Sequence, residues 1–547
     1  MNQRPNTNLG SDLLAFSLGL FLAVSLSEWS AAVVLDDPSV AMGRLANAPG
    51  MAGSSNLRYW IALALALGGI TLVAVRRAGN VSGLAAGKKT NQGSVGTAKQ
   101  KGGTPNLSTG PGPLRWFWIL PLVWFAWQFL AAGQSIELKL TTATMKHFFS
   151  CIACYFVGWL TFSRARSRAV ALVLVTGGLL LALWNGFTQK YGGLRETREF
   201  YEQAYRGELS PDLQVEFNTP EFRTMFEAPG FQKRINSERI YSTLTYPNSF
   251  AGAILLLLPM SLALVHQFCR RASFVLRATL VGVLGYAGVA CLIWSGSKAG
   301  WLVALALIAL ATLQLFRSTV TPALVDTNSP GVPAKPGTQR ADRRRHINPS
   351  DKEPQSASKA STSSVDRSAG GVHESRRLLG AGWGIRAGII GLVCLVGLAG
   401  FFAKYSDYFR RGAPSVGARF GYWTAAFQTA AKHPLLGTGP GTFSVSHAQV
   451  KDPEAEMARL AHNDYLEQAS DSGWVGLISY TMWIFGALGF VFRRGFPDVI
   501  SFGLWLGCVG FALQSLVEFG LYVPALAWPA MVFLGGLVGN HHGFTRG

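Results

Sequence analysis

The residues best suited to chemistry lie in a polar run just before an apolar stretch. His462 is followed by Asn463 and Asp464, and the apolar stretch covers residues 474–492. If a helix begins here, its N-terminal dipole disfavours the imidazolium, so we expect a neutral histidine that can accept a proton. Asn463 or Asp464 can cap this helix, and Glu467 completes a capping-box pattern with Asp464. The alternative is a surface histidine that only contacts the cap.

Three basic residues lie next to predicted helices. Two of them come shortly before apolar stretches, and the third lies at the start of a helix with an aromatic face. Arg419 starts a segment whose aromatic residues share one helical face, Lys298 lies in a hairpin at 295–300, and Arg239 precedes Tyr-Pro-Asn at 246–248. A charge held near a membrane interface is costly when idle, so each is a candidate ligand for an anion. The alternative for the Arg419 segment is a short interfacial helix whose aromatic residues rest at the lipid headgroups. The alternative for Arg239 and Lys298 is snorkelling to lipid phosphates.

The composition predicts an all-α polytopic membrane protein. The chain has 547 residues, of which 49% are hydrophobic and only 14% charged, against about 25% charged in soluble domains. Apolar runs long enough to cross a bilayer recur along it, and in lipid such runs must be helical. About twelve spans are expected, at 13–35, 60–75, 116–132, 148–162, 169–187, 250–265, 275–294, 301–316, 379–402, 474–492, 499–519 and 521–540. The last two are alternatively one re-entrant pair.

The charge of the loops predicts the orientation. Residues 76–115 carry seven Lys and Arg and no acid, and the other strongly basic loops fall on the same side of a twelve-span arrangement. That side is expected to be cytoplasmic, with both termini inside. The net charge of +20 therefore reflects topology, and no nucleic-acid partner is expected. The long loops 188–249 and 403–473 fall on the periplasmic side and are expected to carry short helices.

The spans and loops give a domain organisation. Residues 80–113 and 318–377 are rich in small and polar residues without hydrophobic periodicity, which predicts disordered cytoplasmic loops. The first apolar run is either an uncleaved span, which we favour, or a signal peptide. The predicted segments are helices 1–2 at 1–79, helices 3–5 at 114–187, helices 6–8 at 250–317, helix 9 at 378–402, the catalytic loop at 403–473 and helices 10–12 at 474–547.

Two other chemistries find little support. The loop Gly-Thr-Gly-Pro-Gly at 437–441 lacks the Lys-Ser/Thr of a phosphate-binding loop, and no spacing of His, Asp and Glu predicts a metal site. All six cysteines lie in or beside predicted spans, so a disulfide framework is not expected. The pair Cys151 and Cys154 has redox or metal spacing, but within an apolar span packing is the favoured interpretation.

Four motifs, in order along the chain, resemble those of the O-antigen ligase and polymerase family. Each motif alone is loose, and the ordered set, over residues 239–480, is more specific. The motifs are Tyr246-Pro247-Asn248; Ser295-Gly296-Ser297-Lys298-Ala299-Gly300; Arg419 and Trp423 with Pro434-Leu435-Leu436-Gly437-x-Gly439-x-Gly441-x-Phe443; and His462-Asn463-x-x-Leu466 with Gly473-x-x-Gly476-Leu477.

The resemblance implies a bacterial inner-membrane glycosyltransferase of the GT-C type that acts without a metal or other cofactor. Such enzymes take a glycan from an undecaprenyl-diphosphate carrier on the periplasmic side and pass it to lipid A core, another glycan or a protein. His462 and Arg419 match the family's catalytic loop residues. Lys298, Arg239, Asn248 and Asn463 are assigned to substrate binding, with Lys298 standing where the family often has arginine. The alternative function is a transporter or a flippase of lipid-linked glycans, since twelve spans are also common there.

Overall fold

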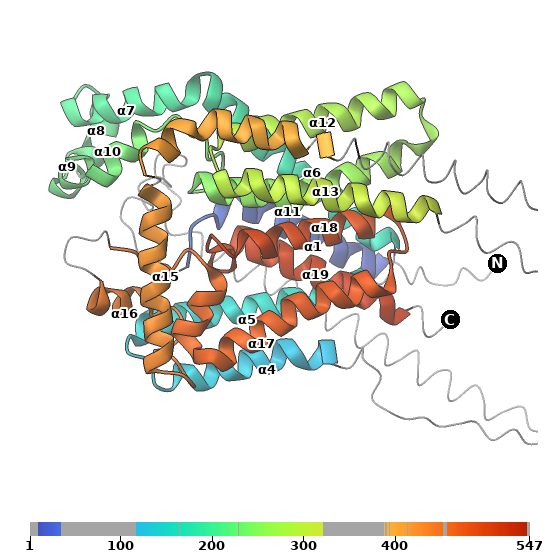
Figure 1. Ribbon diagram of the computed structural model, residues 1–547. Coiled ribbons are helices and arrows are strands. Elements are labelled where there is room, and N and C mark those ends of the chain that lie inside the picture. Colours follow the sequence, from blue (N-terminus) through green and yellow to red (C-terminus); the bar gives the residue numbers. More distant parts are fainter. Residues whose placement is uncertain are drawn as a thin grey trace, which may run out of the picture. The chain divides into compact units, whose positions relative to one another are not determined.

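The computed structural model describes residues 9–33, 116–162, 165–227, 229–320, 388, 391–392, 394–412, 414–451 and 457–543. The predicted span 60–75, both predicted disordered loops except for residues 318–320, and much of the predicted span 379–402 lie outside these ranges. The chain divides into two compact units, one formed by Met1–Leu307 with Phe401–Gly547 and the other by Ile308–Gly400. All candidate site residues belong to the first unit, which the following paragraphs describe (Figure 1).

The described elements are all helices, in agreement with the predicted all-α class. Five of them are long and apolar enough to cross a membrane, and they are Gly10–Glu28, Ser167–Arg206, Pro247–Arg271, Phe274–Trp294 and Asp464–Arg494. Three shorter apolar helices are Trp116–Ala132, Lys298–Gln314 and Val499–Gln514. The chain is therefore a helical membrane protein, and the count of twelve spans stays a prediction.

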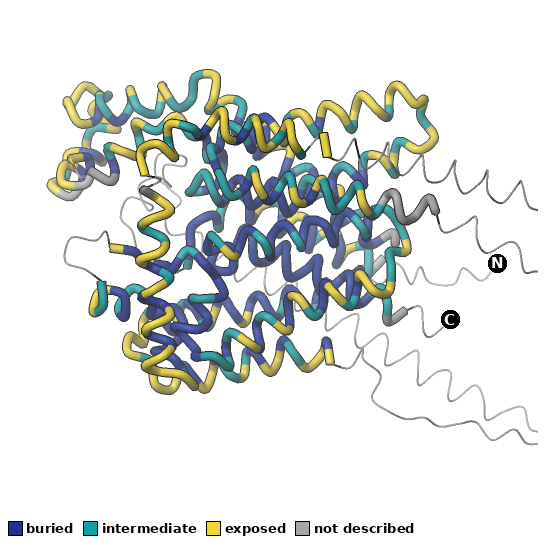
Figure 2. The backbone as a smooth tube through the Cα atoms, in the orientation of Figure 1, coloured by how far each residue is buried: buried dark blue, intermediate teal, exposed yellow. Residues whose placement is uncertain are grey.

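Four helix pairs form the buried centre of this unit, where Figure 2 shows long stretches of buried backbone. They are α5 (Leu138–Thr161) with α19 (Pro524–Gly543), α1 (Leu9–Glu28) with α6 (Ala165–Thr188), α11 (Pro247–Phe268) with α18 (Val499–Gln514), and α4 (Trp116–Ala132) with α17 (Asp464–Arg494). Glycine permits the closest approach: a Cβ at Gly535 would lie 1.9 Å from the Tyr155 carbonyl oxygen, and one at Gly507 would lie 2.0 Å from that of Leu256. Small residues at such contacts are how helices pack tightly in lipid.

The first long loop folds into a small helical module. It contains α7 (Leu194–Arg206), α8 (Pro211–Phe217), α9 (Pro220–Glu227) and α10 (Pro229–Ile235), and the last three each begin at a proline. Proline suits the first turn of a helix because its missing N–H has no partner there. The module has an aromatic core of its own, made of Tyr201, Ala204, Phe217, Phe222, Phe226 and Phe231.

The second long loop contributes α15 (Pro414–Lys432) and α16 (Phe443–Val450). Helix α15 ends just before His433 and Pro434, as the sequence predicts, because proline cannot continue a helix. Both long loops thus carry helices, as expected. Helix α12 (Phe274–Trp294), by contrast, exposes much of its apolar surface (Figure 2).

One predicted boundary is wrong in a way that matters for the site. The predicted span 499–519 is too long, because α18 ends at Gln514 and a buried turn, including the short 3-10 helix Gly520–Tyr522, leads to α19. Hydropathy alone cannot separate an apolar turn packed in protein from an apolar helix in lipid. Helix α17 begins at Asp464, where the capping residues predict a helix start, and it is kinked at Ser472 and Gly473, just before the predicted span 474–492.

Candidate active site

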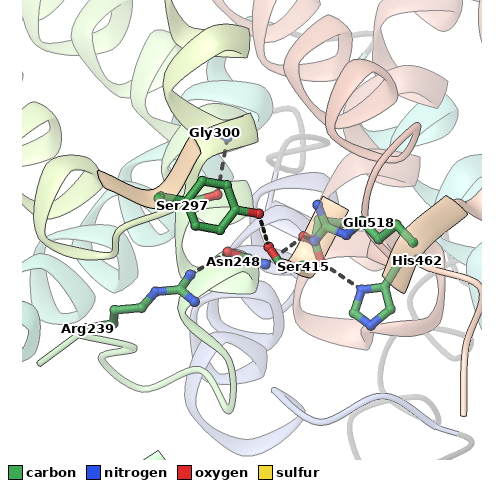
Figure 3. Close-up of polar contacts among 9 residues, drawn as sticks. Arg239, Asn248, Ser297, Gly300, Ser415, His462 and Glu518 are labelled. Atoms are coloured by element: carbon green, nitrogen blue, oxygen red, sulfur yellow. Dashed lines mark hydrogen bonds and ion pairs between the residues drawn. The ribbon is translucent and has the colours of Figure 1, made fainter. Parts of the chain in front are cut away.

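Five separate parts of the chain supply the candidate side chains, of which Figure 3 labels Arg239, Asn248 and His462. Arg239 lies in the segment before α11, and Asn248 lies in the first turn of α11. Lys298 is the first residue of α13 (Lys298–Val320), and Arg419 lies on α15. His462 comes two residues before α17. The fifth part is the turn between α18 and α19, and it carries a residue that the sequence did not single out.

That residue is Glu518, whose carboxylate joins three of the predicted site residues. Its Oε1 accepts hydrogen bonds from Arg419 Nη2 and, at 2.6 Å, from Asn248 Nδ2. Its Oε2 lies 3.3 Å from His462 Nδ1. Burial raises the pKa of Glu518, but the hydrogen bond from His462 and the positive charges of Arg419 and Arg239 outweigh it, so the pKa lies below its usual value. The carboxylate is therefore ionised at neutral pH.

Arg239 extends this network through Asn248. Its Nη2 donates to Asn248 Oδ1 at 2.6 Å, and its Nε donates to the Ser295 carbonyl oxygen at 2.8 Å. The second contact depends on Gly296, which has a φ of +62° and whose Cβ, if present, would lie 3.0 Å from Arg239 Nε. Glycine is suited to this position because it adopts positive φ freely and adds no side chain against the guanidinium.

Lys298 lies beside this network without joining it. Its Nζ lies 3.8 Å from the centre of the Tyr408 ring and 5.1 Å from that of Tyr405, a cation–π arrangement. Burial, together with the charges of Arg239 and Arg419, lowers the pKa of Lys298, which precedes the predicted span 301–316. The three basic groups are thus close enough to influence one another, but among the described residues only Arg419 of the three donates directly to Glu518.

His462 is held in an unusual backbone conformation. Its φ is +52°, in the left-handed region that residues other than glycine rarely adopt and that is found most often at functional sites. The imidazole ring stacks on the Tyr422 ring, with 6.0 Å between the ring centroids. It packs edge-to-face with the Phe519 ring, with 4.8 Å between the centroids. The side chain is 31% exposed. Its Nδ1 faces Glu518, so its other nitrogen, Nε2, is directed away from the carboxylate (Figure 3).

The expected capping pattern is only half right. Asn463 is the N-cap of α17, and its Oδ1 accepts the N–H groups of Tyr465 and Leu466, each at 3.0 Å. Asp464 and Glu467 form no capping box, because both lie inside the helix and accept hydrogen bonds from other segments. Since the oxygen of Asn463 is used in capping, its contact with substrate stays a prediction.

The sequence did contain a signal for Glu518. It is the one acidic residue in the apolar stretch 499–540. An ionisable residue within such a stretch is by default a functional candidate, because an idle charge there is costly. The sequence did not reveal which residues contact Glu518. They come from α11, α15 and the loop before α17.

The described residues contain no group of three or more His, Cys, Asp and Glu side chains that could hold a metal ion. Cys151 and Cys154 are both buried and unbonded to each other. A small pocket beside Glu518 is lined by residues of α11, α18 and the following turn, among them Asn248, Gln514 and Ser515.

Comparison with known proteins adds a family to this geometry. Residues 371–481 match the family model described as O-antigen ligase. No curated protein matches the chain. The matched region includes Arg419 and His462, while Arg239, Lys298 and Glu518 lie outside it. Over residues 371–481 the chain is therefore similar to O-antigen ligases, in agreement with the resemblance that its ordered motifs predict.

Proposed function

We propose that this protein moves a glycan from an undecaprenyl-diphosphate carrier to an acceptor hydroxyl on the periplasmic face of the inner membrane. The observation that carries this proposal is the excess of basic groups around one carboxylate. Arg239, Arg419, Lys298 and His462 gather near Glu518, so the site holds more potential positive charge than the single acid balances. Such a site suits a substrate with several negative charges.

A diphosphate is the anion that this arrangement fits best. Arg419 presents a planar guanidinium that can donate to two phosphate oxygens, and Lys298 adds a point charge at the tip of the hairpin. Held in this way, the departing diphosphate needs no proton, because the basic groups stabilise the negative charge that develops on it. We call Arg419 and Lys298 the diphosphate clamp. Arg239 has a supporting role, because its guanidinium already donates hydrogen bonds to Asn248 and to the Ser295 carbonyl oxygen.

His462 is the proposed base. An ionised carboxylate can only accept, so Glu518 favours the neutral tautomer that carries its hydrogen on Nδ1 and leaves a lone pair on Nε2. Nε2 then takes the proton of the acceptor hydroxyl as its oxygen attacks the anomeric carbon. The bond from that carbon to the diphosphate breaks, and the electron pair leaves with the diphosphate. Attack opposite the leaving group inverts the anomeric centre.

Purified protein in proteoliposomes, supplied with an undecaprenyl-diphosphate-linked glycan and a candidate acceptor, tests this proposal. General-base assistance is worth about a hundred- to ten-thousand-fold, so His462→Ala should lower turnover by a factor in that range while donor binding persists. His462→Gln can orient a hydroxyl but cannot take its proton, so it separates the two roles. Unchanged turnover in His462→Ala would refute the base and favour the transporter alternative.

The same proposal places loops 188–249 and 403–473 in the periplasm and both termini in the cytoplasm. A cysteine introduced at Ser210, on the first of these loops, should react with a membrane-impermeant reagent in cells whose outer membrane is permeabilised. Protection of that cysteine would reverse the orientation. The glycan profile of a deletion strain identifies the acceptor class. Loss of the glycan ladder on lipid A indicates lipid A core, shortened glycans indicate another glycan, and unmodified protein indicates a protein acceptor.

A further inference from the structure

Three buried acids follow one another along the first turns of α17. They are Asp464, Glu467 and Asp471, and each is 0% exposed. Within the described part of the chain, no basic side chain forms an ion pair with any of them. Burying an unpaired carboxylate is costly, so a purely packing role explains them poorly. Their hydrogen bonds indicate what they do instead.

Each acid accepts a backbone N–H from a different segment of the site. Glu467 Oε2 accepts from the Ala461 N–H at 2.9 Å, and Asp464 Oδ2 accepts from the Leu521 N–H at 2.8 Å. Asp471 Oδ2 accepts from the Gly441 N–H at 2.6 Å. A buried backbone N–H that loses its acceptor is costly, so these three hydrogen bonds tie three separate segments of the site to one helix.

Two of these loops carry the proposed base and its carboxylate partner. Ala461 immediately precedes His462, and Leu521 lies three residues after Glu518. The Glu518 turn is also fixed on its other side, where the Asp464 N–H donates to the Ser515 carbonyl oxygen at 2.9 Å. The Leu521 carbonyl oxygen, in turn, lies 2.7 Å from His147 Nε2. One end of α17 therefore sets the backbone on both sides of the His462–Glu518 contact.

We infer that Glu467 and Asp464 are positioning residues that hold His462 and Glu518 in register with each other. The inference rests on the proposed function, because it deepens the role of the same site. His462 has a left-handed backbone that must be held in place by its neighbours. Glu467 holds the residue before it, and Asn463 caps the helix after it. Without the Glu467 contact, the histidine ring loses its fixed direction toward the acceptor.

Glu467→Met tests this directly, because methionine keeps a similar volume but cannot accept the Ala461 N–H. A misplacement of about 1 Å can cost about a hundredfold, so kcat should fall by about 10- to 100-fold. The KM for the lipid-linked donor should stay near normal, since Arg419 and Lys298 are untouched. Glu467→Gln, which retains an acceptor oxygen, should recover most of kcat. An equal loss in both variants, or a rise in KM alone, would overturn the inference.

A double-mutant cycle separates positioning from general destabilisation. In a His462→Ala background, Glu467→Met should cost little further activity, because the group that it positions is already absent. Asp498→Asn, at the Arg168–Asp498 ion pair near the other end of α18, is the control and should leave kcat unchanged in both backgrounds. Additive losses for Glu467→Met and His462→Ala would show that Glu467 acts only on stability.

Further outcomes keep the inference distinct from the proposed function. If His462→Ala is fully active, the proposed base fails, whatever Glu467 does. If His462→Ala is impaired but Glu467→Met is fully active, only the positioning role fails. Should Glu467→Met not fold, Glu467→Asp replaces it in every arm, because the shorter side chain withdraws the carboxyl group from Ala461 while keeping its chemical character. Asp464→Asn should behave like Glu467→Gln, since it also retains an acceptor oxygen.

Discussion

Helix α18 has an arginine–carboxylate contact near each of its ends, and the two differ in charge balance. Before its first residue, Asp498 pairs with Arg168, which also donates to Ser501 Oγ at 3.0 Å. After its last residue, Glu518 pairs with Arg419 but also faces His462. The first contact is one arginine against one acid. The second is surrounded by further basic groups.

This difference separates a structural contact from a binding site. The Asp498 carboxylate also caps α18 by accepting the Ser501 N–H at 2.7 Å, so both of its oxygens have partners within the protein. Around Glu518 the basic groups outnumber the acid, and a negatively charged ligand can satisfy the remainder. A buried ion pair by itself is weak evidence for function. An unbalanced one, whose carboxylate also faces a partly exposed histidine, is stronger evidence.

The largest expected effect is at Arg419. Arg419→Ala should abolish transfer while expression and membrane insertion stay normal, because the clamp loses the group that can donate to two phosphate oxygens. Arg419→Lys should retain only a small residual activity, since a point charge cannot replace the planar fork. Transfer assays in proteoliposomes measure both. Near-normal transfer by Arg419→Ala would remove the clamp and, with it, the contrast between the two contacts.

A smaller effect is expected at Lys298, which lies beside the network. Loss of one hydrogen bond to a charged group costs about 1.5 kcal/mol, or about tenfold in binding. Lys298→Ala should therefore raise the donor KM by about tenfold with a smaller change in kcat. Lys298→Arg should be tolerated, because the positive charge remains at the same hairpin tip. A fall in kcat without a change in KM would place Lys298 outside the donor clamp.

The smallest effect on transfer is expected at Asp498. Asp498→Asn keeps a good capping residue but removes the charge that pairs with Arg168. Its melting temperature in detergent should fall, while transfer per folded molecule stays unchanged. A loss of transfer without a loss of stability would show that the balanced contact also belongs to the functional site.

The same residue gives a dependence on pH with a definite sign. Burial raises the pKa of Asp498, but the Ser501 N–H and the Arg168 charge outweigh it and hold the pKa below its usual value. A depressed folded-state pKa contributes stability that is present above the ordinary carboxylate pKa of about 4 and is lost as pH falls through the folded value. Acidification through that window should therefore destabilise the wild-type protein more than Asp498→Asn.

The sequence was informative about individual residues and poor at their contacts. The proline after α15 predicted the end of that helix, and Asn463 was correctly named as a possible cap. Glu518 stands out as the one acid in the apolar stretch 499–540, but its place in a turn was hidden because an apolar turn and an apolar span have the same hydropathy. The roles of Asp464 and Glu467 were misread as a local capping box, whereas their partners are the Leu521 and Ala461 N–H groups, one of them far away in sequence.

The sequence by itself indicated a helical membrane protein whose ordered motifs resemble those of O-antigen ligases. It did so because bilayer thickness imposes long apolar runs, and because the motif residues recur in a fixed order. Only the tertiary structure decided which charges meet. Arg419 and Glu518 are 99 residues apart, and Arg239 reaches Glu518 only through Asn248. Such contacts depend on how α11, α15, α17 and α18 pack against one another. Hydrophobic patterning shows which segments are helices, but it does not show which helices pack together.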